Sequence, residues 1–471
     1  MVYQFHSVPS SFNFDGRWIK PRLAQEVKRR KVNIINRVMV TDLLYDGGHV
    51  AGAIGVGTRR PNIYLFKARA VVLSSGRTTR LSRNVTGVPF NMRICPSDTG
   101  DGKGMAFRAG LPVVNMEFFS PRRLAIGGFQ VGMGAPRNTF QPAGSLVDRE
   151  GNVVVPRTHF YDWKNIRKID PVEERRRFLE RRKRDLAPLS RLRPERGPLY
   201  LDCTGGTEEE IRYIEWSMSN EGHGYLLLRY MQEEGIDLRR DKIEFGWNDR
   251  ELAGTASAGV WVDENLETGL KGLFAAGDEV GGVPWSSGPG AVVMGWHAGE
   301  MAAKHARGGH QGGVDKERLE ILEETCREMM GRKEGDTWQE VWLSLQNIMD
   351  NYCGEVRSGP LLKVGLERIQ DLRDAMRLKA ESPHELMRSF EVRSLLDNAE
   401  MIIRASLERR ESRIDPFRFI RSDYPEQDDE NYFAFLGIRR EGDGVQFFKV
   451  PHRFGRLQTA QARAFLSHRW P

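Results

Sequence analysis

The chain has 471 residues, of which 39% are hydrophobic and 29% charged, and this length predicts two to four domains with sizeable cores. That apolar content excludes a wholly disordered chain. No run approaches the roughly 18 uncharged apolar residues that a membrane span needs, which excludes an integral membrane protein. The N-terminus has no basic segment followed by an apolar one, so we expect no secretory signal.

The four cysteines, Cys95, Cys203, Cys326 and Cys353, are scattered and form no C-x-x-C pair. They predict neither a disulfide framework nor a metal site, and no iron–sulfur cluster held by this chain alone. Scattered thiols suit a reducing cytoplasm.

The net charge is +7, and residues 168–196 contribute much of it, with 11 Lys and Arg against 6 Asp and Glu. This segment is either a patch for nucleic acid or an acidic partner, or a solvated helix with opposite charges four residues apart. The interleaved acids favour the helix, so we expect no nucleic-acid partner.

In chain order, residues 20–31 predict a surface helix with Leu23, Val27 and Val32 on one side. Strands are predicted over 33–46, 49–57 and 62–68. The apolar run 68–76, which ends in small residues, predicts a buried parallel strand whose end meets a bound group.

From about residue 118 to 257 the sequence turns irregular, aromatic and rich in charge, which predicts a domain inserted into the first. Strand and turn patterns return after it, and residues 291–306 predict a helix. Helical periods also run through 363–376 and 395–407, whereas the tail, 411–471, reads as mostly irregular.

Three glycine-rich elements carry the chemistry. SSGR ends the strand at Val71–Leu73, where a small residue lets a ligand approach the backbone. TGDG (Thr99–Gly102) opens a helix whose free N–H groups suit a polyanionic or polyhydroxyl ligand, with Asp101 placed to accept from sugar hydroxyls. LFAAGDEVGG places Asp278 just past a third strand end. Because ligands bind outside the carboxyl ends of strands, the three together predict one dinucleotide site.

The segments ARAVVLSSG, TGDGKGMAFRAGLPVVNMEF and VDENLETGLKGLFAAGDEVGG resemble the flavoprotein subunit family of fumarate reductase and succinate dehydrogenase. The resemblance implies an α/β fold: a two-part Rossmann-like FAD-binding domain with an inserted α+β capping domain and a helical C-terminal domain. The implied boundaries are 1–117 and 258–307 for the two FAD-binding parts, 118–257 for the capping domain and 308–471 for the C-terminal domain.

Within the family, DGRWIKPRLAQEV, TASAGVWV, SSGPGAVVMGWHAGE and DYPEQDD resemble the alpha subunit of adenylylsulfate reductase. In that branch the flavin exchanges electrons with an iron–sulfur partner and reacts with small anions. The resemblance therefore implies bound FAD, a small anionic substrate and an iron–sulfur electron-transfer subunit.

The resemblance also assigns residues to the cofactor. Gly76, Thr99, Asp101 and Gly102 would line the adenosine and ribityl side of FAD, and Asp278 would bind a ribityl hydroxyl. Ser286, Ser287 and Gly288 begin a helix whose N–H groups would face the flavin O2 edge, which favours the negative charge of reduced flavin. Met39 would offer backbone groups to the adenine.

Candidate catalytic residues are Arg122, Arg123 and Trp285. Arginines bind sulfate or phosphate bidentately, but an arginine-rich chain favours the alternative that these two are surface residues. Trp285 would stack on substrate or flavin, or belong to the core. Glu279 would donate a proton or cap a backbone turn.

The sequence departs from the family in two ways. It contains no G-x-G-x-x-G loop, so we expect the chain to begin within the FAD-binding domain. Either a second chain supplies the missing half, or the sequence is a truncated product or an incomplete gene product. The family's dicarboxylate-handling His and Arg are also absent, and Gly282 stands near the Arg position.

These observations predict an FAD-dependent oxidoreductase subunit of the cytoplasm that passes electrons between flavin and a small anionic substrate. Two alternatives stay open: a flavin-dependent reductase of an activated C=C bond, and a non-catalytic or split subunit of a larger redox complex.

Overall fold

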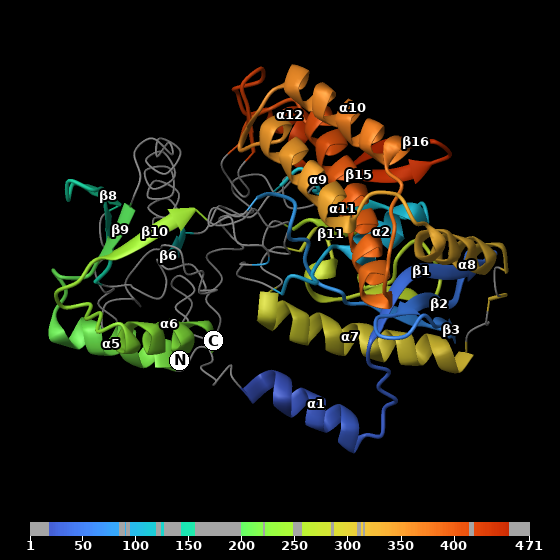
Figure 1. The fold of residues 1–471 in the computed structure, drawn as a ribbon, viewed down its shortest axis with the longest axis horizontal. Coiled ribbons are helices and arrows are strands. Elements are labelled where there is room, and N and C mark those ends of the chain that lie inside the picture. Colours follow the sequence, from blue (N-terminus) through green and yellow to red (C-terminus); the bar gives the residue numbers. More distant parts are fainter. Residues whose placement is uncertain are drawn as a thin grey trace, which may run out of the picture.

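The computed structural model describes residues 18–83, 90, 95–118, 124–126, 143–155, 199–219, 222–247, 257–283, 287–308, 312–313, 316–413 and 419–451. Figure 1 shows a large body that carries most of the helices, with a smaller unit beside it.

The N-terminal region forms a three-stranded antiparallel sheet in the order β1–β2–β3. The strands are β1 (Val38–Asp46), β2 (His49–Gly57) and β3 (Ile63–Lys67). Gly47 and Gly48 both have positive φ and make the tight turn between β1 and β2, as hairpins of this length require. The strands predicted over 49–57 and 62–68 are confirmed, whereas the first strand starts at Val38 rather than at residue 33.

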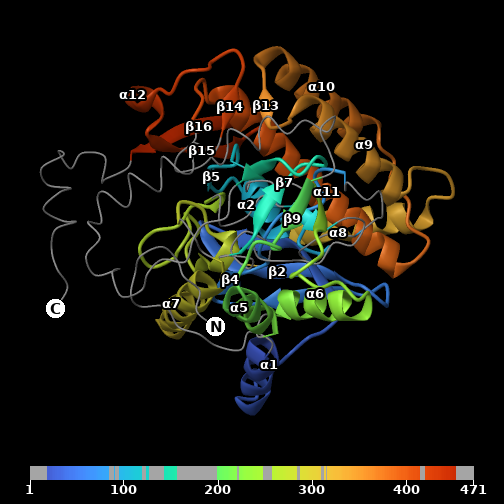
Figure 2. The same cartoon turned by 90° about the vertical axis from the view of Figure 1, so that its left-hand side faces the viewer.

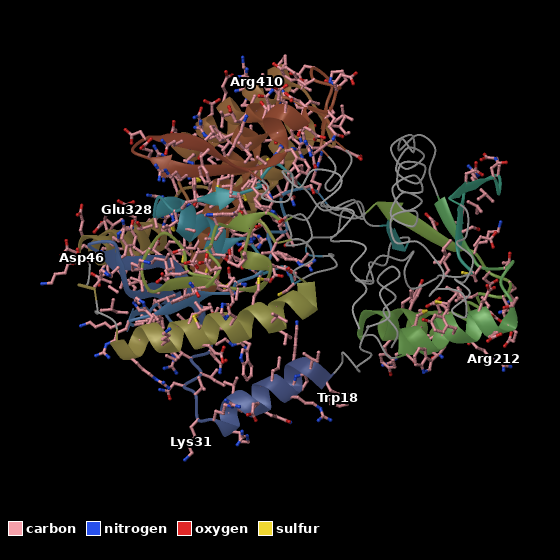
Figure 3. All side chains as sticks on the ribbon, turned by 180° about the vertical axis from the view of Figure 1, so that it is seen from behind. Trp18, Lys31, Asp46, Arg212, Glu328 and Arg410 are labelled. Carbon is pink, nitrogen blue, oxygen red and sulfur yellow. The ribbon has the colours of Figure 1, made fainter. Side chains whose placement is uncertain are left out.

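Helix α1 (Ile19–Arg29) confirms the predicted N-terminal helix, but it buries none of its residues. Leu23 and Val27, on its apolar side, are exposed. Figures 1 and 2 both show α1 apart from the rest of the large body, on the side of α7, and Figure 3 shows Trp18 and Lys31 at its two ends.

A parallel pair of strands lies at the centre of the large body. β4 (Val71–Leu73) pairs with β12 (Leu273–Ala275), and Val71 lies opposite Leu273. The predicted parallel pairing is confirmed, although Val72 is exposed rather than buried. In the described part of the chain this sheet holds these two strands alone.

Two helices adjoin the parallel pair. α2 (Asp101–Arg108) follows the TGDG segment, and α7 (Ser287–Gly308) confirms the helix predicted over 291–306. Between β12 and α7 the chain makes a short 3-10 turn, η5 (Gly277–Glu279). The glycine motifs therefore lie where strands end and helices begin.

The smaller unit is a five-stranded sheet in the order β6–β10–β9–β7–β8 with two helices. Its elements are β6 (Leu124–Ile126), β7 (Ser145–Val147), β8 (Val153–Val155), β9 (Leu199–Asp202), α5 (Glu208–Ser219), α6 (Gly222–Glu233) and β10 (Ile243–Trp247). Its core is separate from that of the large body and includes Leu201, Ile211, Leu227 and Ile243. The basic segment 168–196 lies outside the described residues.

Four helices dominate the C-terminal region: α8 (Lys316–Gly331), α9 (Trp338–Tyr352), α10 (Gly359–Ala375) and α11 (Pro383–Glu408). Thr337 and Glu340 form a reciprocal capping box at the start of α9, and serine hydroxyls cap α10 and α11. The helical periods predicted over 363–376 and 395–407 are confirmed.

The tail is more regular than its sequence suggested. β15 (Ala434–Glu441) and β16 (Gly444–Pro451) form a hairpin that extends a sheet begun by β5 (Val113–Val114) and β11 (Gly259–Val260). The tail also contains helix α12 (Asp429–Tyr432) and strand β14 (Ile420–Arg421), which pairs with β13 (Val356–Arg357). The prediction of a mostly irregular tail is therefore wrong for residues 434–451.

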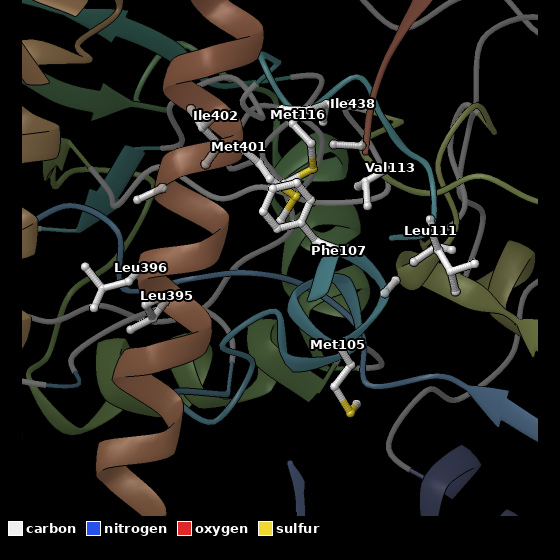
Figure 4. Packing of buried hydrophobic residues seen from close by; sticks show 14 of the residues in the cluster. Met105, Phe107, Leu111, Val113, Met116, Leu395, Leu396, Met401, Ile402 and Ile438 are labelled. Atoms are coloured by element: carbon white, nitrogen blue, oxygen red, sulfur yellow. The ribbon is translucent and has the colours of Figure 1, made fainter. Parts of the chain in front are cut away.

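One core cluster joins these layers. Phe107 of α2 packs with Met116, with Met401 and Ile402 of α11, and with Ile438 of β15 (Figure 4). Helix α11 thus anchors α2, whose N-terminus belongs to the candidate site. None of the helices in the described part of the chain combines the length and apolar composition that a bilayer crossing requires.

Candidate functional site

The candidate site lies beyond the carboxyl ends of β4 and β12. Because the two strands run in parallel, Ser75 and Gly76 after β4 come close to Asp278 and Glu279 after β12. Gly76 has φ +91°, a backbone conformation that L side chains rarely adopt, and a Cβ there would meet no described atom within 4 Å. Open space therefore adjoins the backbone at this strand end.

The N-terminus of α2 faces the same place. Gly100 caps the helix with φ +71°, and the backbone N–H of Gly102 donates to Ser75 Oγ at 3.0 Å. The Thr99 hydroxyl donates to Asp101 Oδ2 at 2.9 Å. The TGDG segment thus brings its backbone to the end of β4, as the sequence predicted.

Helix α11 fixes this segment from behind. The amide of Asn398 donates to Gly100 O at 3.0 Å and accepts from the Thr78 hydroxyl at 3.0 Å. One buried side chain therefore links the loop after β4 to the cap of α2, and the site rests on the main core.

Asp278 and Glu279, both on η5, have different partners. Asp278 Oδ2 pairs with Arg77 Nε at 2.5 Å near the surface. Glu279 is fully buried, accepts from the Ser75 hydroxyl, and lies so close to α2 that a Cβ on Gly102 would be 2.5 Å from its carboxylate carbon. The absence of a side chain at Gly102 therefore makes room for Glu279.

Lys103 is also completely buried, in the first turn of α2. Its Nζ donates to Gly76 O at 2.6 Å and to Asp278 O at 3.3 Å, and lies 3.6 Å from Glu279 Oε1. We call Ser75, Asp101, Lys103 and Glu279 the lysine cluster. Two carboxylates and one ammonium make it net negative when all are ionised.

Asp101 carries an unsatisfied atom. Its Oδ1 is sealed from solvent and has no hydrogen-bond partner among the described residues. Burial raises the pKa of Asp101 to about 6, although the Ser394 and Thr99 hydroxyls act in the opposite direction. Burial likewise raises the pKa of neighbouring Asp98 to about 6. A carboxyl group with a free acceptor atom suits a ligand that donates hydrogen bonds.

The structure gathers five of the residues singled out from the sequence: Gly76, Thr99, Asp101, Gly102 and Asp278. Ser287 and Gly288 begin α7, which packs on η5 through Ala291 and Gly277. Met39 lies in β1 opposite Val56, and its side chain packs on a different core. Four further candidates, Arg122, Arg123, Trp285 and Ser286, lie outside the described residues.

The site also contains residues that the sequence did not single out. Ser75, Arg77 and Lys103 lie beside the predicted glycines, and Asn398 comes from α11. A polar residue next to the strand-end glycine Gly76 was a signal for Ser75 and Arg77, whereas no local signal marked Lys103. Nothing local to residue 398 points to a loop about 300 residues earlier.

Two family models match the chain. The FAD binding domain matches residues 5–242, about half of the chain, and the fumarate reductase flavoprotein C-terminal domain matches residues 342–462.

The relatives agree with these models. A fumarate reductase (CoM/CoB) subunit of Methanothermobacter marburgensis is 28% identical over 418 residues, which cover 86% of this chain and 70% of the relative. The fumarate reductase flavoprotein subunit of Haemophilus influenzae is 25% identical and covers 90% and 70%.

Solved structures show the same fold. Adenylylsulfate reductase of Archaeoglobus fulgidus has a TM-score of 0.77 at 23% identity, with 92% of this chain and 75% of that chain covered. Quinol fumarate reductase of E. coli has a TM-score of 0.67 at 22% identity and covers 88% and 71%. The strand-end loops, the fold and both family models together place this chain in the FAD-binding flavoprotein family of fumarate reductase type.

Proposed function

We propose that this chain passes electrons between FAD and a small anionic substrate. The observation that carries the proposal is the convergence of Gly76, the TGDG segment and Asp278 at the ends of two parallel strands. Since ligands of α/β folds bind outside such strand ends, one cofactor would contact all three.

Two features of the described residues fit FAD. The open space at Gly76 admits a ligand against the backbone, and Asp101 Oδ1 is a buried acceptor without a donor. Gly76, Thr99, Asp101 and Gly102 would line the adenosine and ribityl side, Asp278 would accept from a ribityl hydroxyl, and the backbone of Met39 would face the adenine. FAD, when bound, supplies the redox chemistry.

Helix α7 would act on the flavin through its N-terminus. Ser286, Ser287 and Gly288 lie at or just before its first turn, where free N–H groups and the positive end of the helix dipole favour an anion. Arg122, Arg123 and Trp285 would bind the substrate, the arginines through bidentate contacts to an oxyanion.

The domain assignment belongs to the same proposal. We assign 1–117 and 258–307 to the FAD-binding domain, 118–257 to the capping domain and 308–471 to the C-terminal domain. The separate core of the five-stranded sheet supports the inserted unit. The β15–β16 hairpin pairs with β5, so the C-terminal segment also completes a sheet of the FAD-binding part.

The proposed electron partner is an iron–sulfur protein. The cysteines of the described residues are free and far apart in sequence, so a cluster is expected on another chain rather than on this one. Thiols outside disulfides support a place in the reducing cytoplasm. Of the two alternatives, reduction of an activated C=C bond requires bound flavin to react with a substrate, whereas a non-catalytic role does not.

A second chain is proposed for the face formed by β4 and α7. β4 has no strand on its other edge in the described part of the chain, and a two-stranded sheet is marginal alone. On α7, Val292, Val293 and Trp296 expose 59%, 69% and 71% of their surface. A βαβ unit carrying a G-x-G-x-x-G loop would add a parallel strand to β4 and cover these side chains.

A photo-crosslinking residue at Val293, introduced in the cell of origin, tests this interface. Cross-links to a peptide from another chain that carries G-x-G-x-x-G support it. Cross-links confined to a second copy of this chain, or to an upstream segment of a longer form of it, contradict the two-chain arrangement.

An absorbance spectrum of the purified chain, followed by sulfite titration, tests the main proposal. Flavin bands that sulfite bleaches support a flavin open to a small anion, and one related structure is described as a covalent adduct with sulfite. Flavin that sulfite does not bleach favours the C=C reductase. No flavin after incubation with FAD contradicts the proposal for this chain alone and leaves a non-catalytic or split subunit.

A further inference from the structure

Lys103 is the buried charge that the proposed cofactor contacts do not use. Its side chain is 0% exposed, although lysine is among the residues that are almost never fully buried without a partner. A buried ammonium is costly unless hydrogen bonds and a counter-charge compensate it. The surroundings of Lys103 must therefore explain its presence.

The two hydrogen-bond acceptors of Lys103 come from two loops. Gly76 O, at 2.6 Å, belongs to the loop after β4, and Asp278 O, at 3.3 Å, belongs to the loop after β12. Glu279 Oε1, at 3.6 Å, supplies the counter-charge from the second loop. Lys103 therefore donates one hydrogen bond to each loop, and the Glu279 carboxylate compensates its charge without a hydrogen bond.

Those loops also carry two residues of the proposed cofactor site. Gly76 provides the open backbone, and Asp278 provides the carboxylate. Lys103 contacts both residues through their carbonyl oxygens, and so it fixes the spacing of the two loops while the Asp278 carboxylate stays with Arg77. Ser75 reinforces this link, because its hydroxyl accepts from Gly102 N–H and donates to Glu279.

We propose that Lys103 is a positioning residue for the cofactor site, which holds the Gly76 loop and the Asp278 loop at the separation that FAD requires. The identity of the ligand rests on the proposed function. The link between the loops rests on the contacts of Lys103 alone, so the two are tested separately.

Hydrogen exchange of the ligand-free chain tests the link. The amides of Thr79, Gly100 and Val280 are hydrogen-bonded within or next to these loops. In Lys103→Met, which keeps the apolar stem, they are expected to exchange about tenfold faster, since hydrogen bonds to a charged group are stronger than neutral ones. Amides of the β15–β16 hairpin are expected to keep the wild-type rate.

FAD titration tests the consequence. Lys103→Met is expected to weaken FAD binding about 10- to 100-fold, and Lys103→Gln, which keeps two N–H donors, is expected to fall between it and the wild type. Lys271→Met is the matched control, because Lys271 also pairs with a glutamate, Glu267 at 2.9 Å, but is 63% exposed. It is expected to bind FAD as the wild type does.

The outcomes separate the claims. Unchanged exchange at Thr79, Gly100 and Val280 in the Lys103 variants overturns the positioning role, whatever FAD does. Equally faster exchange in the hairpin also overturns it, because it shows general destabilisation. Faster local exchange in a chain that never binds FAD sustains the link and contradicts the proposed function. If Lys103→Met does not fold, Lys103→Gln decides by the same measurements.

Discussion

Two of the clusters of buried charge in the large body differ in what surrounds them. The lysine cluster lies at strand ends, beside the open backbone of Gly76. The arginine cluster, made of Glu117, Arg409, Glu411 and Arg413, lies at the end of α11.

The arginine cluster is packed closed. Arg409 pairs with Glu117 at 2.7 Å and with Glu411 at 2.6 Å, and its guanidinium lies over the rings of Phe118 and Tyr432. Arg413 also pairs with Asp429, which fits an anchor for the tail. Buried charge alone therefore does not mark a ligand site. Open space and position at strand ends distinguish the lysine cluster.

The largest expected effect comes from a substitution in the arginine cluster. Arg409→Ala removes one partner of a buried pair and leaves Glu117 uncompensated, whereas Glu411 keeps Arg413, so we expect a loss of about 3–5 kcal/mol in the free energy of unfolding. Urea unfolding measures it. Arg368→Ala is the control, because Arg368 is 61% exposed and pairs with exposed Asp371. Similar midpoints for the two variants would show that the arginine cluster is not a scaffold.

The next effect concerns Asp278, which lies on η5 beside the lysine cluster. Asp278→Asn removes the proposed acceptor for a ribityl hydroxyl and weakens the pair with Arg77, so FAD affinity should fall about 10- to 100-fold. Flavin fluorescence titration measures the affinity, with Asp371→Asn as an exposed control. Wild-type affinity in Asp278→Asn would remove this residue from the site.

The stability of the chain should also depend on pH through Asp101 of the lysine cluster. Burial raises the pKa of Asp101 to about 6, above its unfolded value, so unfolding releases a proton between about pH 4 and pH 6. The free energy of unfolding should therefore fall as pH rises through this window, by up to roughly 1.4 kcal/mol per pH unit for one proton. Asp98 acts in the same direction.

Asp101→Asn should flatten that slope. The same measurement on Asp98→Asn gives the part of the slope that comes from the Asp98 carboxyl group. A slope that Asp101→Asn leaves unchanged would show that the Asp101 carboxyl titrates normally.

The smallest stability effect compares two glycines. Gly76 and Gly48 both have positive φ, +91° and +79°, and a Cβ at either would meet no described atom within 4 Å. Alanine at either position should therefore cost about 1 kcal/mol in unfolding free energy from backbone strain. Only Gly76→Ala should also weaken FAD binding, because its Cβ enters the open space at β4. Equal FAD affinity in the two variants would move the cofactor away from Gly76.

The sequence predicted those parts of the fold that have a local signal. The strands over 49–57 and 62–68 and the helices within 363–376 and 395–407 follow from apolar periodicity. The β15–β16 hairpin was missed even though Gly442–Gly444 forms a turn between two apolar runs. The long arginine-rich tail around it obscured that signal.

The candidate site divides in the same way. Gly76, the TGDG segment and Asp278 were predictable because glycine and aspartate at strand ends have a local physical meaning. Lys103 was not, because a lysine in a first helical turn is usually solvated. Its burial depends on carbonyls 27 and 175 residues away in the chain.

The measurement that tests the central claim most directly is the thermal stability of the purified chain as FAD is added. If the residues at the ends of β4 and β12 hold the cofactor, unfolding should shift upward and saturably. Free FAD at 100 times its Kd should add about 2.7 kcal/mol to the free energy of unfolding, and Asp278→Asn should need more FAD for the same shift. An unfolding temperature that FAD leaves unchanged would contradict the claim that this chain's own residues form the FAD site.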